Sequence, residues 1–116
     1  MFLLSELKCL TLIIAMEARN QSDRTQALVG SVAIYRAKNE HLSICQSMRK
    51  YKSYQWYWEK QRVSLKKYEL KLVEPVAKRE LKAPTLVGRR YFNPTTLSKR
   101  FKTKFKPVKS GCLLFY

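Results

Sequence analysis

The sequence predicts a mainly α-helical fold in one small domain. Apolar residues recur at three- and four-residue spacing over residues 3–16 and again over residues 24–37, which is the helical period. With 116 residues, of which 46% are apolar and 12% aromatic, the chain suffices for one modest core but not for a second. We therefore expect residues 1–116 to form a single unit, with helices first and a short β or extended segment near the C-terminus.

The first predicted helix runs from about residue 3 to residue 17, so that Glu17 lies in its last turn. The apolar positions that define it are Leu3, Leu7, Leu10 and Ile14. The polar stretch at residues 20–23 follows, in which Ser22 or Asp23 is suited to cap the next helix.

The second predicted helix covers residues 24–37 and has Gly30 in its middle. Its expected core positions are Leu28, Val29, Val32 and Ala33, with Tyr35 or Arg36 beside them. Glycine costs about 1 kcal/mol in a helix interior, so we expect another backbone to pack closely there.

Later elements are less regular. Residues 42–48 predict a short third helix or turn. Residues 61–81 alternate charged and aliphatic side chains in helical fashion, and we expect this segment to break at Pro75 and to end before Pro84. The closing SGCLLFY, residues 110–116, predicts a terminal strand or a tucked-in segment.

The charge is strongly one-sided. There are 24 Lys and Arg residues against 8 Asp and Glu, a formal net charge of +16. Such a surface attracts polyanions, both nucleic acid and the anionic polymers of a bacterial envelope. The basic region KRFKTKFKPVK, residues 99–109, is the densest part of this charge.

The N-terminus predicts a protein that is made and folded in a reducing cytoplasm, and the cysteines predict no disulfide framework. Cys9, Cys45 and Cys112 are far apart and include no CxxC pair, so we expect no disulfide framework, with Cys9 and Cys45 serving as small buried hydrophobes. The N-terminal MFLLSELK has no basic segment before its apolar residues, and we predict neither a signal peptide nor a membrane span.

Four segments, in order, resemble the cell-wall hydrolase family typified by the spore-cortex-lytic enzyme SleB. CLTLIIAMEARNQS (9–22) is similar to a helix that ends in Glu-Ala-Arg, and TQALVGSVAIYRAKN (25–39) to the helix that follows it. SYQWYW (53–58) resembles an aromatic-rich segment, while GRRYFNPTT (88–96) and SGCLLFY resemble the closing part. The resemblance covers nearly the whole chain and is weakest between residues 60 and 87.

The resemblance implies a lysozyme-like α+β fold that cuts the glycan strand of peptidoglycan with Glu17 as general acid. A glycosidic oxygen must be protonated as its bond breaks, and apolar neighbours such as Ile13 and Ile14 favour the neutral, proton-donating carboxyl. By their positions in the segments that resemble the family, Gln26, Tyr91 and Asn93 are implied to be substrate-binding residues. For Glu17 the alternative is a solvated helix end, and for Asn93 a turn that caps a helix.

Aromatic side chains in residues 51–58 are candidates for the floor of a saccharide groove. Rings stack on sugar faces, so Tyr54 and Trp56 are predicted substrate-binding residues, and Gln55 is placed to bond a hydroxyl or acetamido group. Core packing of Trp56 explains the same pattern equally well.

Few other groups suggest chemistry. Asp23 and Glu40 are the nearest candidates for a second carboxylate, and neither has a typical spacing. A lytic transglycosylase needs only one acid, so we favour it over a muramidase. His41 and Cys45 lie four residues apart, but a single His without further ligands makes a thiol or metal site improbable, and we predict no metal and no cofactor.

The leading hypothesis is thus a phage lysin, made in the host cytoplasm, that acts on the bacterial wall and adheres to anionic envelope polymers through residues 99–109. A basic nucleic-acid-binding module, in which rings of residues 51–58 stack on bases, is the alternative. A non-catalytic virion protein is the third possibility.

Overall fold

The computed structural model describes residues 4–18, 20–50, 67–85, 92–94, 108–110 and 113–115. These residues form four helices and three short strands: α1 (Leu4–Ala18), α2 (Asp23–Asn39), α3 (Ile44–Lys50), α5 (Lys67–Lys82), β1 (Phe92–Pro94), β2 (Val108–Ser110) and β3 (Leu113–Phe115). The prediction of a mainly helical fold is confirmed. The observed bounds of α1 and α2 differ from the predicted ones by one or two residues, while α3 begins and ends two residues later.

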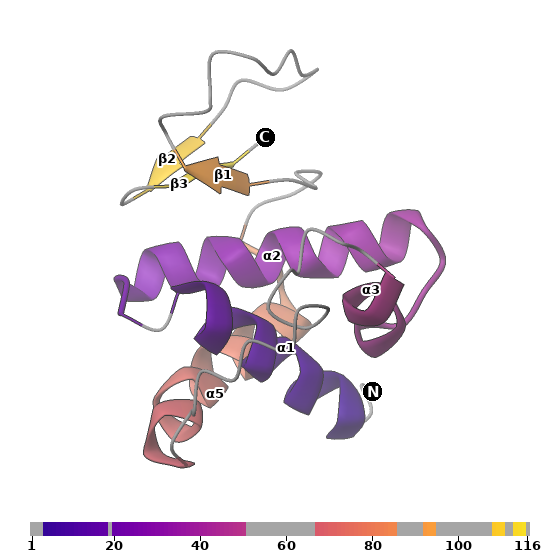
Figure 1. Ribbon diagram of the computed structural model, residues 1–116, viewed down its shortest axis with the longest axis horizontal. Coiled ribbons are helices and arrows are strands. Elements are labelled where there is room, and N and C mark those ends of the chain that lie inside the picture. The colour runs from indigo at the N-terminus through magenta and orange to yellow at the C-terminus, as the bar shows by residue number, and fades with distance from the viewer. Residues whose placement is uncertain are drawn as a thin grey trace.

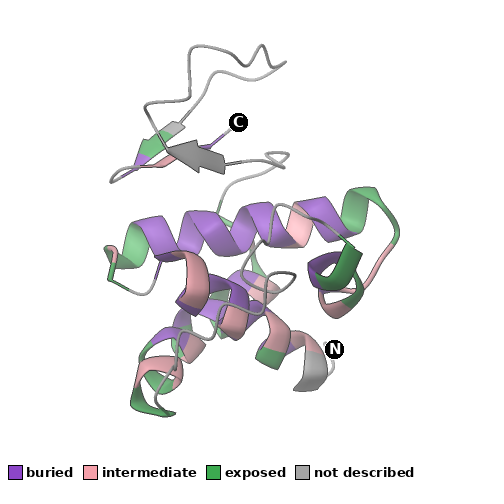
Figure 2. Ribbon diagram, viewed as in Figure 1, coloured by how far each residue is buried: buried purple, intermediate pink, exposed green. Residues whose placement is uncertain are grey.

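Helix α2 is the centre of the molecule. In Figure 1 it crosses the view between the sheet on one side and α1 and α5 on the other. Residues 25–33 are buried without interruption, which Figure 2 shows as a continuous purple stretch. A helix buried on every side must bury polar residues too, and Thr25, Ser31 and Arg36 are among them.

Both ends of α2 are closed by local hydrogen bonds. The Ser22 hydroxyl accepts a hydrogen bond from the backbone N–H of Thr25, so Ser22 is the N-cap, as one of the two predicted candidates. At the other end His41 adopts a positive φ of 55°. Its N–H bonds to the Lys38 carbonyl, and that of Leu42 to the Ala37 carbonyl, the two bonds of a Schellman ending.

Gly30 lies where α2 crosses α1 and α5. A Cβ atom at this position would be 3.0 Å from Ile14 Cδ1 of α1 and 3.4 Å from Glu80 Cγ of α5. The predicted close approach at Gly30 is therefore real, but its nearest partners are side chains rather than a backbone.

The expectation that the helix breaks at Pro75 is wrong. Helix α5 runs from Lys67 to Lys82 with Pro75 inside it and ends before Pro84. Proline removes one intrahelical hydrogen bond and costs about 3 kcal/mol in a helix interior. Burial on both sides of it, by Val73 before and by Val76 and Ala77 after, offsets this cost.

The strands form an antiparallel sheet with the order β1-β3-β2. Within the predicted C-terminal segment 110–116, residues 113–115 form β3, a strand as in one of the two predicted forms, and β3 is the central strand, while Ser110 ends β2. Phe115 of β3 is fully buried. The Ser110 hydroxyl of β2 shares a 2.7 Å hydrogen bond with the Thr25 hydroxyl, which ties the sheet to the first turn of α2.

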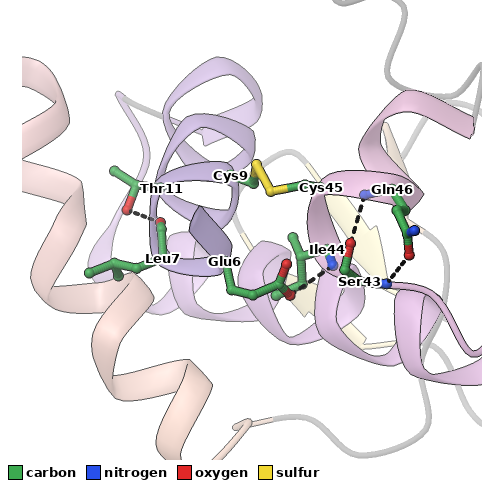
Figure 3. The surroundings of a disulfide bond; sticks show 8 residues. All are labelled: Glu6, Leu7, Cys9, Thr11, Ser43, Ile44, Cys45 and Gln46. Atoms are coloured by element: carbon green, nitrogen blue, oxygen red, sulfur yellow. Dashed lines mark hydrogen bonds between the residues drawn. A yellow bond between two sulfur atoms is a disulfide. The ribbon is translucent and has the colours of Figure 1, made fainter. Parts of the chain in front are cut away.

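A disulfide joins α1 to α3, so the prediction of no disulfide framework, with Cys9 and Cys45 as small buried hydrophobes, is wrong for this pair, which is bonded and only half-buried. Cys9 and Cys45 are bonded, with their Cα atoms 5.4 Å apart (Figure 3). Their separation of 36 positions hides this proximity in the sequence, because it arises only when α2 folds back and sets α3 against α1.

The start of α3 is held by three further hydrogen bonds, also drawn in Figure 3. Ser43 and Gln46 form a capping box, in which each side chain accepts a hydrogen bond from the other residue's N–H. The Glu6 carboxylate of α1 accepts a 2.8 Å hydrogen bond from the Ile44 N–H.

Candidate active site

Glu17 lies in the last turn of α1, as the sequence predicts, and its side chain is half-buried. The same helix turns Ile13 and Ile14 fully into the core, with no exposed surface. Glu17 is therefore placed at the border between the core and the surface.

Gln26 closes the end of the helix that carries Glu17. Its side-chain Nε2 donates a 3.1 Å hydrogen bond to the Ala18 carbonyl, which also accepts the N–H of Gln21 at 3.0 Å. One N–H of this predicted substrate-binding amide is thus committed to the backbone next to Glu17. Gln26 is a positioning residue for the end of α1 in this structure.

Helices α1 and α2 and strand β2 meet at this point. We call it the α1–α2 corner and define it as residues 17–18, 22–26 and 110. Gln26 connects the corner to α1, and the neighbouring Thr25 connects it to β2 through Ser110. Thr25 also accepts a hydrogen bond from the Ser22 hydroxyl. Because adjacent residues of α2 make both connections, the end of α1 and the edge of the sheet are fixed relative to each other.

The other predicted binding residues are not assembled by the described part of the chain. Tyr54, Gln55, Trp56 and Tyr91 lie outside the described residues. Asn93 belongs to β1, where its backbone is paired with that of Leu114, so the alternative of a helix-capping turn at Asn93 is wrong.

Neither candidate for a second carboxylate is set up as a partner of Glu17. Asp23 is exposed and its Oδ2 pairs with Arg79 Nη2 at 2.7 Å. Glu40 is the C-cap of α2, at the opposite end of this helix from Gln26, and it pairs with Lys50 at 3.4 Å. At 1.5 Å rise per residue, the 14 positions from Gln26 to Glu40 span about 21 Å, too far for a shared reaction centre.

His41 and Cys45 do not form a reactive pair. The Cys45 sulfur is bonded to Cys9, and His41 is exposed at the C-terminal end of α2. Within the part of the chain that the structure describes, no group of three or more His, Cys, Asp or Glu residues is arranged to hold a metal ion.

Sequence reasoning missed Glu80, a fully buried carboxylate on α5. Its Oε1 accepts hydrogen bonds from the Ser31 hydroxyl at 2.6 Å and from the Thr85 N–H at 2.7 Å, and its Oε2 accepts one from the Thr85 hydroxyl at 2.7 Å. The helical spacing from Val73 through Val76 and Ala77 to position 80 places this acid on the buried face, and that pattern is visible in the sequence.

Comparison of the chain with protein-family models, with curated proteins and with solved structures finds no match. Among the helices of the described residues, none has the length and apolar character needed to cross a membrane.

Proposed function

We propose that the protein is a peptidoglycan glycosidase with a lysozyme-like α+β fold, a lysin of the SleB type, and that Glu17 is its general acid. The observation that carries the proposal is the half-buried Glu17 at the α1–α2 corner, where Gln26 fixes the end of its helix. A general acid must be both accessible to a substrate and held in place, and this position suits both needs.

The positions of the two predicted second carboxylates favour lytic transglycosylation over hydrolysis. Asp23 is paired with Arg79, and Glu40 lies at the other end of α2, so neither supports a two-carboxylate mechanism. In the proposed reaction Glu17 gives its proton to the glycosidic oxygen, and the bond from that oxygen to C1 of N-acetylmuramic acid breaks. The 6-hydroxyl oxygen of the same sugar bonds to C1 and its proton returns to the Glu17 carboxylate, which leaves a 1,6-anhydro end.

The disulfide suits an enzyme that works at the cell wall. Disulfides persist in oxidising surroundings such as the periplasm and the cell surface, and a chain made in the cytoplasm would form this one after it leaves. The net charge of +16 supports adhesion to anionic envelope polymers, which we assign to residues 99–109.

Product analysis tests this function. Purified protein is incubated with peptidoglycan, and the soluble products are separated and weighed by mass spectrometry. Fragments with 1,6-anhydro ends are the expected result, whereas fragments that end in a reducing N-acetylmuramic acid would make the enzyme a muramidase. Intact glycan after complete incubation with folded protein would contradict the glycosidase proposal, and the nucleic-acid-binding alternative would then be tested.

A further inference from the structure

The outer face of α5 carries a straight row of four lysines. Lys67, Lys71, Lys78 and Lys82 are all exposed and recur at intervals of four, seven and four residues. At 3.6 residues per turn these intervals keep all four on one face, and at 1.5 Å per residue the row is about 22 Å long. We call these four residues the lysine stripe.

Apolar surface lies on both sides of the lysine stripe. On one side are the exposed Tyr68 and Leu72, one turn apart, with 59% and 72% of their surface exposed. On the other is a cavity of about 350 Å³ between α1 and α5, whose surface is mainly apolar and whose lining residues are Leu7, Lys8, Thr11, Leu12, Leu70 and Glu74.

Acidic side chains do little to neutralise this face. Glu74 pairs with Lys78 at 3.5 Å, but both side chains are about half exposed, and water and salt screen such surface pairs strongly. Glu80 is directed into the core. The stripe therefore keeps its positive charge toward solvent.

We propose that α5 docks on the surface of an anionic phospholipid membrane. The lysines meet the lipid phosphates, while Tyr68 and Leu72 enter the boundary between headgroups and acyl chains. The combination of charge with exposed apolar side chains favours a membrane over a soluble polyanion, because a nucleic acid or a polyphosphate chain gains nothing from an exposed Leu72. This inference does not rest on glycan cleavage by Glu17.

The test measures binding of the full-length protein to vesicles. The vesicles contain an equimolar mixture of phosphatidylglycerol and phosphatidylcholine, or phosphatidylcholine alone. A stripe variant, K67Q/K71Q/K78Q/K82Q, is compared with a control, R24Q/K38Q/R49Q/K50Q, which removes the same number of positive charges from exposed positions outside α5 and outside residues 99–109. A Lys→Arg version of the stripe variant checks that charge, not the lysine itself, is needed.

Each lysine near an anionic surface contributes about 1 kcal/mol, or about fivefold in affinity, so loss of four lysines should weaken binding of the stripe variant to the mixed vesicles by about 600-fold. The control should lose only a few-fold, the arginine version should bind as the parent does, and the parent should bind pure phosphatidylcholine weakly. Equal losses in the two four-site variants would overturn the proposal, since net charge alone would then explain binding.

A charge-neutral variant distinguishes a membrane from a soluble polyanion. Leu72→Ser should weaken binding to mixed vesicles by about fivefold, since part of a leucine side chain leaves the apolar phase, and should leave binding to soluble polyphosphate unchanged. If Leu72→Ser binds vesicles as tightly as the parent, while the stripe variant loses vesicles and polyphosphate equally, the face binds soluble polyanions and the membrane proposal is wrong.

Discussion

Glu80 and Glu17 are two carboxylates in contrasting regions of the same small fold. Glu80 is fully buried where α5 crosses α2, and the Ser31 hydroxyl, the Thr85 N–H and the Thr85 hydroxyl all donate to it. Glu17 is half-buried at the α1–α2 corner. The contrast indicates that deep burial alone does not make a carboxylate a candidate for catalysis, because Glu80, surrounded by donors inside the core, fixes helices and cannot reach a substrate.

The two regions also differ in how the chain builds them. The crossing is made of long-range contacts through Gly30, Ile14 and Glu80. The corner is made of neighbours in sequence, Ala18 to Gln26, with one long-range bond from Thr25 to Ser110. Changes at the crossing should therefore act on stability, and changes at the corner on activity.

The largest effect on stability is expected for Glu80→Ala. The substitution leaves three donors without their acceptor and opens a small cavity, so the free energy of unfolding should fall by about 3–5 kcal/mol. Chemical denaturation measures it, with Glu74→Ala on the exposed side of α5 as the control, where a change below about 0.5 kcal/mol is expected. A loss of less than about 1 kcal/mol for Glu80→Ala would mean that the donors find other partners and that the crossing does not depend on this acid.

The disulfide between α1 and α3 should contribute the next largest share of stability. Replacing Cys9 and Cys45 by Ala removes a link that closes a loop of about 36 residues, and should lower the free energy of unfolding by about 3 kcal/mol. Hydrogen exchange at the Ile44 N–H should accelerate, because its bond to Glu6 depends on α3 staying against α1. Unfolding of the parent that is identical with and without a reductant would contradict this role.

Gly30→Ala probes the crossing more gently. The new methyl group would lie 3.0 Å from Ile14 Cδ1, and overpacking of about 1–3 kcal/mol should exceed the roughly 1 kcal/mol gained in helix propensity. We expect a net loss of about 1 kcal/mol. Ile14→Val shortens the opposing side chain, so it should recover part of the lost stability in the Gly30→Ala background. In the parent background it should not stabilise the protein. If the effects of the two substitutions simply add, the two side chains do not compete for space.

Local patterns in the sequence predicted most of the helical fold. The spacing of apolar residues gives α1 and α2 nearly to the residue, and Ser22 was one of two predicted caps. The continuation of α5 through Pro75 could not be predicted, because burial of Val73, Val76 and Ala77 decides it. The same holds for Cys9 and Cys45, whose proximity depends on how α3 packs.

The candidate site was only partly predictable. The position of Glu17 in the last turn of α1 follows from periodicity, and the Gln26 bond to Ala18 does not, since it needs α2 folded against α1. The helical spacing places position 80 on the buried face of α5. Carboxylates are seldom fully buried, however, so the residue type alone would not predict Glu80 in the core.

The most direct test of the central claim is the rate of glycan cleavage by Glu17→Gln. The substitution keeps the size of the side chain and removes the transferable proton, so cleavage per folded molecule should fall by at least about 10²-fold, while the free energy of unfolding changes by less than about 0.5 kcal/mol. Asp23→Asn and Glu40→Gln, measured in parallel, should cleave at nearly the parent rate. A folded Glu17→Gln protein that cleaves peptidoglycan at the parent rate would contradict the account.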